Sequence, residues 1–317
     1  MKRSYVLMVL ALSSLGLVAV SGPASAEPLG PEGGVPPANG RITYVVDSRG
    51  CDDCHVFTVL PDGSDRVKLT DAAVGGPEWS PDGTRLIFPA IAPDGRVTTA
   101  TISADGTGFA IFEIPDPTLN VACWSWSPDG TRLACESWDE TQPDRGGTYT
   151  VSSTDGQDLQ RLTANPYGGG DFPGEFSPDG TRYVFPRENP QRRHGNVALF
   201  VVDADGTGAT RITPWSMNAE GASWSPDGER ILFGSGGAFF TVPPDGTETI
   251  PIELHPGAGF AYPFDPSWSP DGTRFVFSMY LRRTDQVDIF TVAADGSDLQ
   301  QVTNTRREDG FADWGPA

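Results

Sequence analysis

The sequence predicts an all-β fold, a six-bladed β-propeller made of four-stranded antiparallel blades. The first observation is a repeated segment that begins with an aromatic residue and contains Ser-Pro-Asp-Gly, as in residues 79–88. Its core aromatic residues lie 44–50 residues apart, a period typical of propeller blades. They are Trp79, Trp126, Phe176, Trp224, Trp268 and Trp314. The second observation is a segment centred on Asp-Gly that alternates with the first and also occurs six times, at Asp62, Asp105, Asp155, Asp205, Asp245 and Asp295.

Each repeat contains four short stretches with apolar or β-branched residues at alternate positions, which predicts four strands. The Ser-Pro-Asp-Gly turn joins the first two strands, because proline presets φ, aspartate accepts bonds from the following amides and glycine takes the left-handed position. We therefore interpret these aspartates as turn formers. The tryptophan before the turn is expected to fill the wedge between neighbouring blades.

The two ends of the chain are expected to share one blade. Residues 42–46, 55–60 and 67–70 predict three strands and lack an opening one, while residues 311–314 form a spare opening strand. Pairing the two ends closes the ring and leaves no unpaired sheet edge inside it.

Residues 1–26 have the three parts of a secretory signal peptide, namely two basic residues, an apolar stretch and a small-x-small cleavage signal at residues 24–26. A linker rich in Pro and Gly is expected at residues 27–40 and the propeller at residues 41–317. We predict an exported protein in the periplasm or the medium, without membrane insertion.

The chain is strongly acidic, with a formal net charge of −20. Removal of Lys2 and Arg3 with the leader changes the charge from −20 to −22. Such a surface repels nucleic acid, which we exclude as a partner.

The four cysteines form two local pairs, and an exported protein meets an oxidising compartment. A hairpin centred on Asp129 sets Cys123 opposite Cys135, at the short separation that a disulfide requires. Cys51 and Cys54 form the second expected disulfide. Cys51 to His55 also fits the Cys-x-x-Cys-His spacing of haem attachment, and the pair could have a redox role. The structural disulfide is the preferred interpretation, because His55 falls on a strand and the repeat leaves no obvious cavity for a porphyrin.

The repeated Trp-Ser-Pro-Asp-Gly-Thr-Arg segment resembles the repeat of TolB-type propellers, and the likeness covers the whole mature domain. The resemblance implies a funnel through the ring axis and a face that binds a protein or another ligand. Two features differ from family members. Only a linker precedes the propeller, where TolB has an α/β domain, and the Gly-x-Ser-x-Gly motif of the related peptidases is absent from the sequence.

The tight turns fall on one face of the disc, so the longer connections gather on the other, which we call the long-loop face. Loops on a rigid scaffold often carry function, so this face is the candidate binding surface for a protein, peptide or glycan. The aromatic candidates are Trp138, Tyr167, Trp215, Phe260, Tyr262 and Phe264. The basic candidates are Arg187, Arg192, Arg193, Arg282 and Arg283.

A ring of residues directly before the core aromatics includes Glu78, Glu175 and Asp313 and is expected near the axis. Three carboxylates could hold Ca²⁺ together with carbonyls and water. The alternative, which we prefer, is that each acid bonds to loop amides, so that no cofactor is expected.

The sequence favours a non-catalytic binding module. The three histidines, His55, His194 and His255, lie in separate blades and belong to no His-Glu-x-x-His motif. Propellers assemble active sites from scattered loops, so a lyase, lactonase or glycosidase with a site in the funnel is the alternative. A purely structural disc is the third possibility. The sequence does not predict the oligomeric state.

Overall fold

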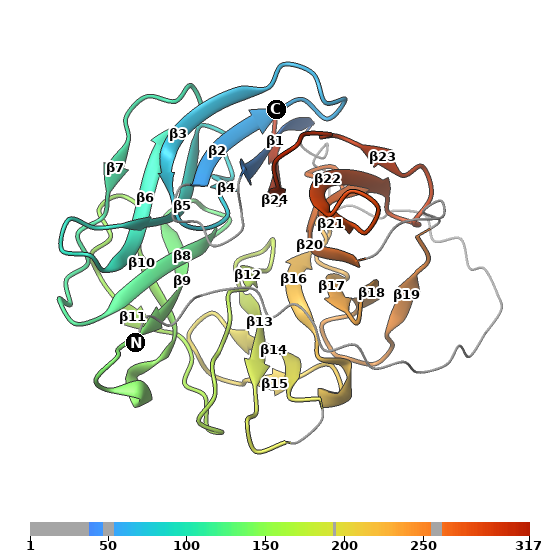
Figure 1. Ribbon diagram of the computed structural model, residues 1–317. Coiled ribbons are helices and arrows are strands. Elements are labelled where there is room, and N and C mark those ends of the chain that lie inside the picture. Colours follow the sequence, from blue (N-terminus) through green and yellow to red (C-terminus); the bar gives the residue numbers. More distant parts are fainter. Residues whose placement is uncertain (1–37, 47–53, 193–194, 255–261) are drawn as a thin grey trace.

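The computed structural model describes residues 38–46, 54–192, 195–254 and 262–317. It contains six four-stranded antiparallel sheets arranged as the blades of a ring, which confirms the predicted six-bladed propeller (Figure 1). The expected leader and most of the expected linker lie outside the described residues. In the part that is described, no helix is long and apolar enough to cross a membrane.

The innermost strands of blades 1 to 6 are β24 (Asp309–Pro316), β4 (Glu78–Trp79), β8 (Asn120–Trp126), β12 (Glu175–Phe176), β16 (Glu220–Trp224) and β20 (Tyr262–Trp268). The second strands are β1 (Asn39–Val46), β5 (Arg85–Ile91), β9 (Arg132–Trp138), β13 (Arg182–Glu188), β17 (Ile231–Ser235) and β21 (Arg274–Leu281).

The third strands are β2 (Cys54–Val59), β6 (Val97–Ser103), β10 (Gly147–Ser152), β14 (Val197–Asp203), β18 (Ala238–Val242) and β22 (Gln286–Ala293). The outermost strands are β3 (Val67–Ala73), β7 (Ala110–Ile111), β11 (Gln160–Arg161), β15 (Thr210–Arg211), β19 (Ile250–Ile252) and β23 (Gln300–Gln301). Two 3-10 turns, η1 (Pro143–Arg145) and η2 (Trp215–Met217), lie in the longer connections.

Blade 1 is completed by both ends of the chain, as predicted. β24 pairs antiparallel with β1, placing Trp314 opposite Ile42 and Asp313 opposite Thr43. β1 begins at Asn39, two residues before the expected propeller boundary, because Asn39 pairs with Pro316 at the end of β24. The ring closure therefore involves slightly more of the chain than the sequence indicated.

The core consists of apolar clusters between neighbouring blades, not of one central mass. Trp79, for example, packs with Val45 of blade 1 and Phe88 of its own blade, and Trp224 packs with Val184 of blade 4. Each core tryptophan side chain thus fills a wedge, as expected.

The Ser-Pro-Asp-Gly turns have the predicted hydrogen bonds. In blade 2, Asp82 Oδ1 accepts from Thr84 N at 3.0 Å and from Ser80 Oγ at 2.6 Å. Gly83 has a φ of +68°, which an L side chain rarely adopts. The bonds from Ser80 and Thr84 hold the pKa of the Asp82 carboxyl below its usual value, consistent with a turn-forming role.

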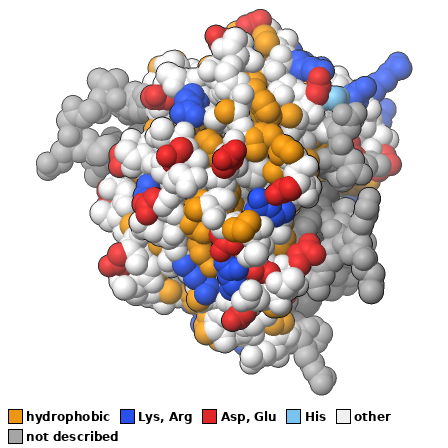
Figure 2. Space-filling model, turned by 90° about the vertical axis from the view of Figure 1, so that its left-hand side faces the viewer, with side chains coloured by type: hydrophobic (Ala, Val, Ile, Leu, Met, Phe, Trp, Pro, Cys, Tyr) orange, Lys and Arg blue, Asp and Glu red, His pale blue; other side chains and the backbone are white. Residues whose placement is uncertain are grey.

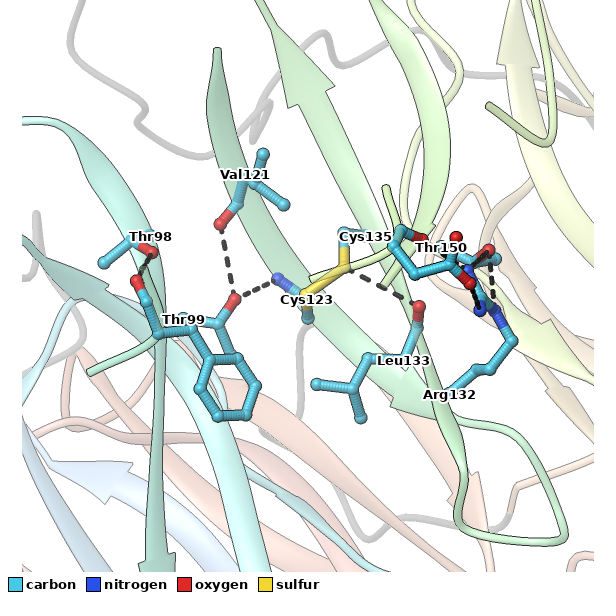
Figure 3. The surroundings of a disulfide bond; sticks show 10 residues. Thr98, Thr99, Val121, Cys123, Arg132, Leu133, Cys135 and Thr150 are labelled. Carbon is cyan, nitrogen blue, oxygen red and sulfur yellow. Dashed lines mark hydrogen bonds and ion pairs between the residues drawn. A yellow bond between two sulfur atoms is a disulfide. The ribbon is translucent and has the colours of Figure 1, made fainter. Parts of the chain in front are cut away.

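Cys123 and Cys135 form the predicted disulfide across β8 and β9 (Figure 3). Their Cα atoms are 3.7 Å apart and both side chains are buried. The amide of Cys123 donates to Thr99 Oγ1 of blade 2 at 2.8 Å, so the bridge is also tied to the neighbouring blade. Cys54 is disulfide-bonded as well, while its expected partner Cys51 lies outside the described residues.

Candidate functional site

A cavity of about 580 Å³ opens at the axis of the ring, and we call it the axial cavity. Its walls come from the innermost strands of all six blades and from the connections before some of them. The connections between second and third strands contribute Asn196 and Gly236, and the adjoining strands of blade 4 contribute Pro186 and Val197. These segments belong to the long-loop face. The cavity therefore opens on the face that the sequence indicated for binding.

Bulges in four innermost strands help to shape this cavity. The pairing with the next strand shifts between Cys123 and Ser125 in β8, and between Phe264 and Ser267 in β20. β16 and β24 contain similar irregularities. A bulge bends a strand and redirects its side chains, which is why bulges often lie beside functional sites. The bulged segments contribute Trp124, Gly221, Asp265, Pro266, Phe311 and Ala312 to the lining.

A two-glycine hairpin lies beside one wall of the cavity. Gly236 and Gly237 join β17 to β18 with φ values of +59° and +81°, as a two-residue hairpin requires. A Cβ on Gly237 would lie 2.9 Å from the Tyr262 ring. The absence of a side chain there leaves room for Tyr262, which lines the cavity.

Two of the three carboxylates that the sequence placed near the axis, Asp313 and Glu175, accept hydrogen bonds from neighbouring blades. Asp313 Oδ2 accepts from the amide of Trp79 at 2.9 Å, and Glu175 Oε2 accepts from the amide of Trp224 at 2.5 Å. Ser267 of blade 6 donates to Asp313 Oδ1 at 2.8 Å. Burial raises the pKa of the Glu78, Glu175 and Asp313 carboxyl groups. The negative charge of Asp313 adds to the effect at Glu78 and Glu175.

The same three acids were the candidates for a Ca²⁺ site. Among the described residues, no group of three or more His, Cys, Asp or Glu side chains is placed to hold a metal ion. Asp313 and Glu175 instead accept bonds from backbone amides. Bonding of the acids to amides, the preferred alternative, is what the geometry shows for these two residues.

Two further acidic residues, Glu220 and Asp265, also line the cavity. Tyr262 Oη donates to Glu220 Oε1 at 3.2 Å. Burial raises the pKa of Glu220 despite this bond. Burial, together with the charge of Glu220, raises the pKa of Asp265 to about 7. Asp265 also has a φ of +49°, uncommon for a residue other than glycine. Perturbed carboxyl groups of this kind are typical of functional sites.

Of the eleven aromatic and basic residues in our candidate set, Tyr262 is the one that lines the axial cavity among those described. Phe264 is half-buried on β20 and does not contribute to the lining. Phe260 and Arg193 lie outside the described residues. The sequence alone did not distinguish Tyr262, which lines the cavity, from the other described aromatic candidates, which do not.

The remaining candidates lie away from the cavity. Trp215 is buried, with 7% of its surface exposed, and packs edge-on against Tyr167 at a ring distance of 5.5 Å. Trp138 is half-buried at the end of β9, and Arg192, Arg282 and Arg283 are exposed. Tyr167 and Trp215 are thus brought together, but as packing partners.

Arg187 differs from the expectation of an exposed basic residue. It is 4% exposed, and its Nε donates to Asp171 Oδ1 at 2.6 Å in a buried ion pair. Its guanidinium also lies 4.9 Å from the ring centres of Phe185 and Phe200. Arg187 lies on β13, and the connection that contains Asp171 packs against this strand, so this arginine serves the core.

His55 lies on β2, as expected, and its Nδ1 is 2.5 Å from Asp71 Oδ1. Cys54 beside it is disulfide-bonded. A sulfur in a disulfide is not available for a thioether bond to haem. The structural role of the Cys51 and Cys54 pair stays a prediction, because Cys51 lies outside the described residues.

The sequence interpretation missed most of the cavity lining. Trp124, Phe172 and Phe311 provide aromatic walls, and Glu220 and Asp265 provide acidic groups. The repeat does contain a signal for several of them, because the positions two and three residues before the core aromatics contribute to the lining in nearly every blade.

The chain has the fold of the TolB-type six-bladed propellers that its repeat indicated. The crystal structure of TolB from Acinetobacter baumannii superposes with a TM-score of 0.69 at 18% identity, covering 88% of this chain and 67% of that chain. A structure of a nidogen/laminin complex gives a TM-score of 0.65 at 10% identity, covering 87% and 98%.

An oligogalacturonate lyase in complex with manganese gives a TM-score of 0.53 at 14% identity, covering 79% of this chain and 71% of that chain. No protein-family model and no curated protein matches the sequence. At these identities the likeness concerns the fold, which hosts both binding proteins and enzymes.

Proposed function

We propose that this chain is an exported recognition module that binds a segment of a protein partner on the long-loop face, with part of that segment inserted into the axial cavity. The observation that carries the proposal is the cavity itself. It combines aromatic walls from Trp124, Phe172 and Phe311 with several polar groups, and it opens on the face with the longest connections. Mostly apolar concave sites with a few placed polar groups are the usual binding sites of proteins.

Two further observations support this proposal. The Cys123–Cys135 disulfide suits an oxidising compartment outside the cytoplasm. The neighbours of similar fold include TolB and a propeller from a nidogen/laminin complex, the second of which is a complex between proteins by its own description. A glycan partner remains the variant of the same proposal that the aromatic walls would also suit.

The test is a capture experiment with a plugged cavity. Ala222 lines the cavity and also packs against the core cluster between blades 4 and 5, so Ala222→Trp is used to narrow the cavity once its melting temperature shows that it is folded. Glu229→Trp places the same side chain on the exposed turn at the opposite face of the same blade. We expect a partner from the envelope or medium of the producing organism to be retained by the wild type and by Glu229→Trp, but not by Ala222→Trp. Equal retention by all three proteins would show that the cavity is not the binding site.

An enzyme with its site in the same cavity is the second candidate. The specific observation is the Glu220 and Asp265 pair, because two carboxyl groups of which one has a pKa near 7 can act as general acid and base. Lyase, lactonase and glycosidase substrates should be screened with wild type, Glu220→Gln and Asp265→Asn. Turnover that both substitutions abolish would favour the enzyme over the recognition module.

A further inference from the structure

We infer that the group inserted into the axial cavity is an alkylammonium ion, such as the side chain of lysine or one end of a polyamine. The inference rests on the proposed function and specifies the chemistry of its ligand. It follows from the acidic residues in the cavity wall, from the unused bonding capacity of the Asp265 carboxyl group, and from the aromatic side chains that line the same cavity.

The charges in the wall are all of one sign. Five carboxyl groups line the cavity, and no Lys, Arg or His contributes to the lining among the described residues. They come from five different innermost strands and surround the space instead of forming one patch. They are Glu78 on β4, Glu175 on β12, Glu220 on β16, Asp265 on β20 and Asp313 on β24. When these carboxyl groups are ionised, they give the low-dielectric cavity one sign of charge, which concentrates ligands of the opposite sign.

Asp265 is the acid with unused bonding capacity. Asp313 and Glu175 accept from backbone amides, Glu220 accepts from Tyr262, and the backbone amide of Trp126 interacts with the Glu78 carboxyl group. No hydrogen bond or ion pair is found for the Asp265 carboxyl group within the described residues. An ionised carboxylate has about four acceptor sites, so an ammonium group with three donors could bond to Asp265 and Glu220 together.

The apolar part of the wall favours an organic cation over a metal ion. Trp124, Phe172 and Phe311 contribute aromatic side chains to the wall, which suit a methylene chain and cation–π contacts, but none of these side chains supplies an oxygen ligand. The carboxyl groups are not placed as a metal-binding group in the described part of the chain. A cavity of about 580 Å³ also exceeds the volume that a bare ion requires.

Proton release gives an independent measure of such binding. Burial raises the pKa of all five carboxyl groups, with Asp265 at about 7. An alkylammonium ion favours the ionised carboxylates, so its binding must expel protons. The affinity should therefore rise as the pH is raised from 6 to 8. The phenol of Tyr262, whose pKa burial raises to about 12, stays protonated over this range.

The experiment is a calorimetric titration with defined probes. The probes are acetyl-Gly-Lys-Gly-amide, the same peptide with an acetylated lysine side chain, spermidine and calcium chloride. We expect the lysine peptide or spermidine to bind, with proton uptake by the buffer and with stronger binding at pH 8 than at pH 6. We expect the acetylated peptide not to bind. A tighter lysine peptide identifies a protein side chain as the source of the ammonium group, and a tighter spermidine identifies a free polyamine.

Matched variants locate the site. Glu220→Gln with Asp265→Asn should weaken alkylammonium binding at least about tenfold, because two charged acceptors are lost. Glu229→Gln, which removes the charge of an exposed residue on the opposite face, should leave it unchanged. The melting temperature of each variant confirms that it is folded, and the pH dependence of the wild type tests the inference without any substitution.

Three results would overturn the inference. They are equal binding of the acetylated peptide, binding of calcium but of neither amine, and no saturable binding of either amine at about 1 mM. The proposed function is tested separately, by the capture experiment. A partner lost only by Ala222→Trp, together with no amine binding, would retain the recognition module and remove the ammonium ligand. Amine binding without any captured partner would retain the ammonium ligand and remove the recognition module.

Discussion

Removal of the last six residues, 312–317, should destabilise the whole propeller, because those residues close the ring. They form most of β24, which pairs with β1 at the other end of the described chain. Trp314 is 5% exposed and packs in the cluster between blades 6 and 1, and its Nε1 donates to Gly40 O at 3.3 Å. Asp313 accepts from the amide of Trp79 and from Ser267 Oγ.

The magnitude follows from these contacts. Loss of a buried tryptophan costs about 3–5 kcal/mol, and each of the three hydrogen bonds contributes about 1 kcal/mol. The expected loss is roughly 6–8 kcal/mol, against a total stability of about 5–15 kcal/mol for a typical domain. At about 2 °C per kcal/mol, the truncated protein should melt roughly 12–16 °C lower or fail to fold.

Urea denaturation and thermal melting of the full and truncated chains provide the assay. Trp224→Ala is the matched control, because Trp224 is 4% exposed and donates a similar indole bond, to Glu175 O at 3.2 Å, within a blade that the chain does not need to close. The truncation should be more destabilising than this substitution. A truncated protein that melts within about 2 °C of the full chain would refute the closure argument.

Two further predictions concern stability. The melting temperature should fall as the pH rises from 5 to 8, because burial raises the folded-state pKa of Asp265 to about 7 and of Asp309 to about 6. The stability that these two carboxyl groups contribute is fully present below their unfolded pKa of about 4 and is lost as the pH rises through their folded pKa values. Asp265→Asn should flatten this slope, and a melting temperature that rises from pH 5 to 8 would contradict the argument. Replacement of Cys123 and Cys135 together by Ser should cost about 3 kcal/mol, as the bridge closes a short loop of sequence separation 12, and an unchanged urea midpoint would count against a stabilising bridge.

The sequence was sufficient for the parts of the fold that depend on short segments. The number of blades follows from the period of the core aromatics, and the turns follow from the bonds that Ser, Asp and Gly form within four residues of one another. The pairing of Cys123 with Cys135 follows from counting outward from one such turn. These features are local, so the residues that determine them are adjacent in the chain.

The loops were harder because their contacts are made at a distance. The sequence indicated polar connecting segments around Arg187 and Trp215, which suggested exposed binding residues. Arg187 instead meets Asp171 across a loop, and Trp215 packs on Phe200 at a ring distance of 5.7 Å. Nothing in the local pattern distinguishes an aromatic or basic side chain that packs under its loop from one that faces solvent. On the side of the disc in Figure 2, acidic, basic and hydrophobic side chains are likewise intermingled.

The axial cavity was missed for a different physical reason, which Trp124 illustrates. In a regular strand, side chains alternate between two faces, so Trp124 should share the face of Trp126 and pack in the wedge between blades. The register shift between Cys123 and Ser125 inserts one residue and breaks this alternation. Trp126 then remains buried in the wedge, whereas Trp124 lines the cavity. Asp265 lies in the corresponding irregularity of β20 and also reaches the lining. Bulges arise where inner strands crowd around the axis, and the sequence of a single repeat does not contain this constraint. Residues such as Trp124 and Asp265 that define the site are therefore those that a regular alternation of side chains assigns to the wrong face of the strand.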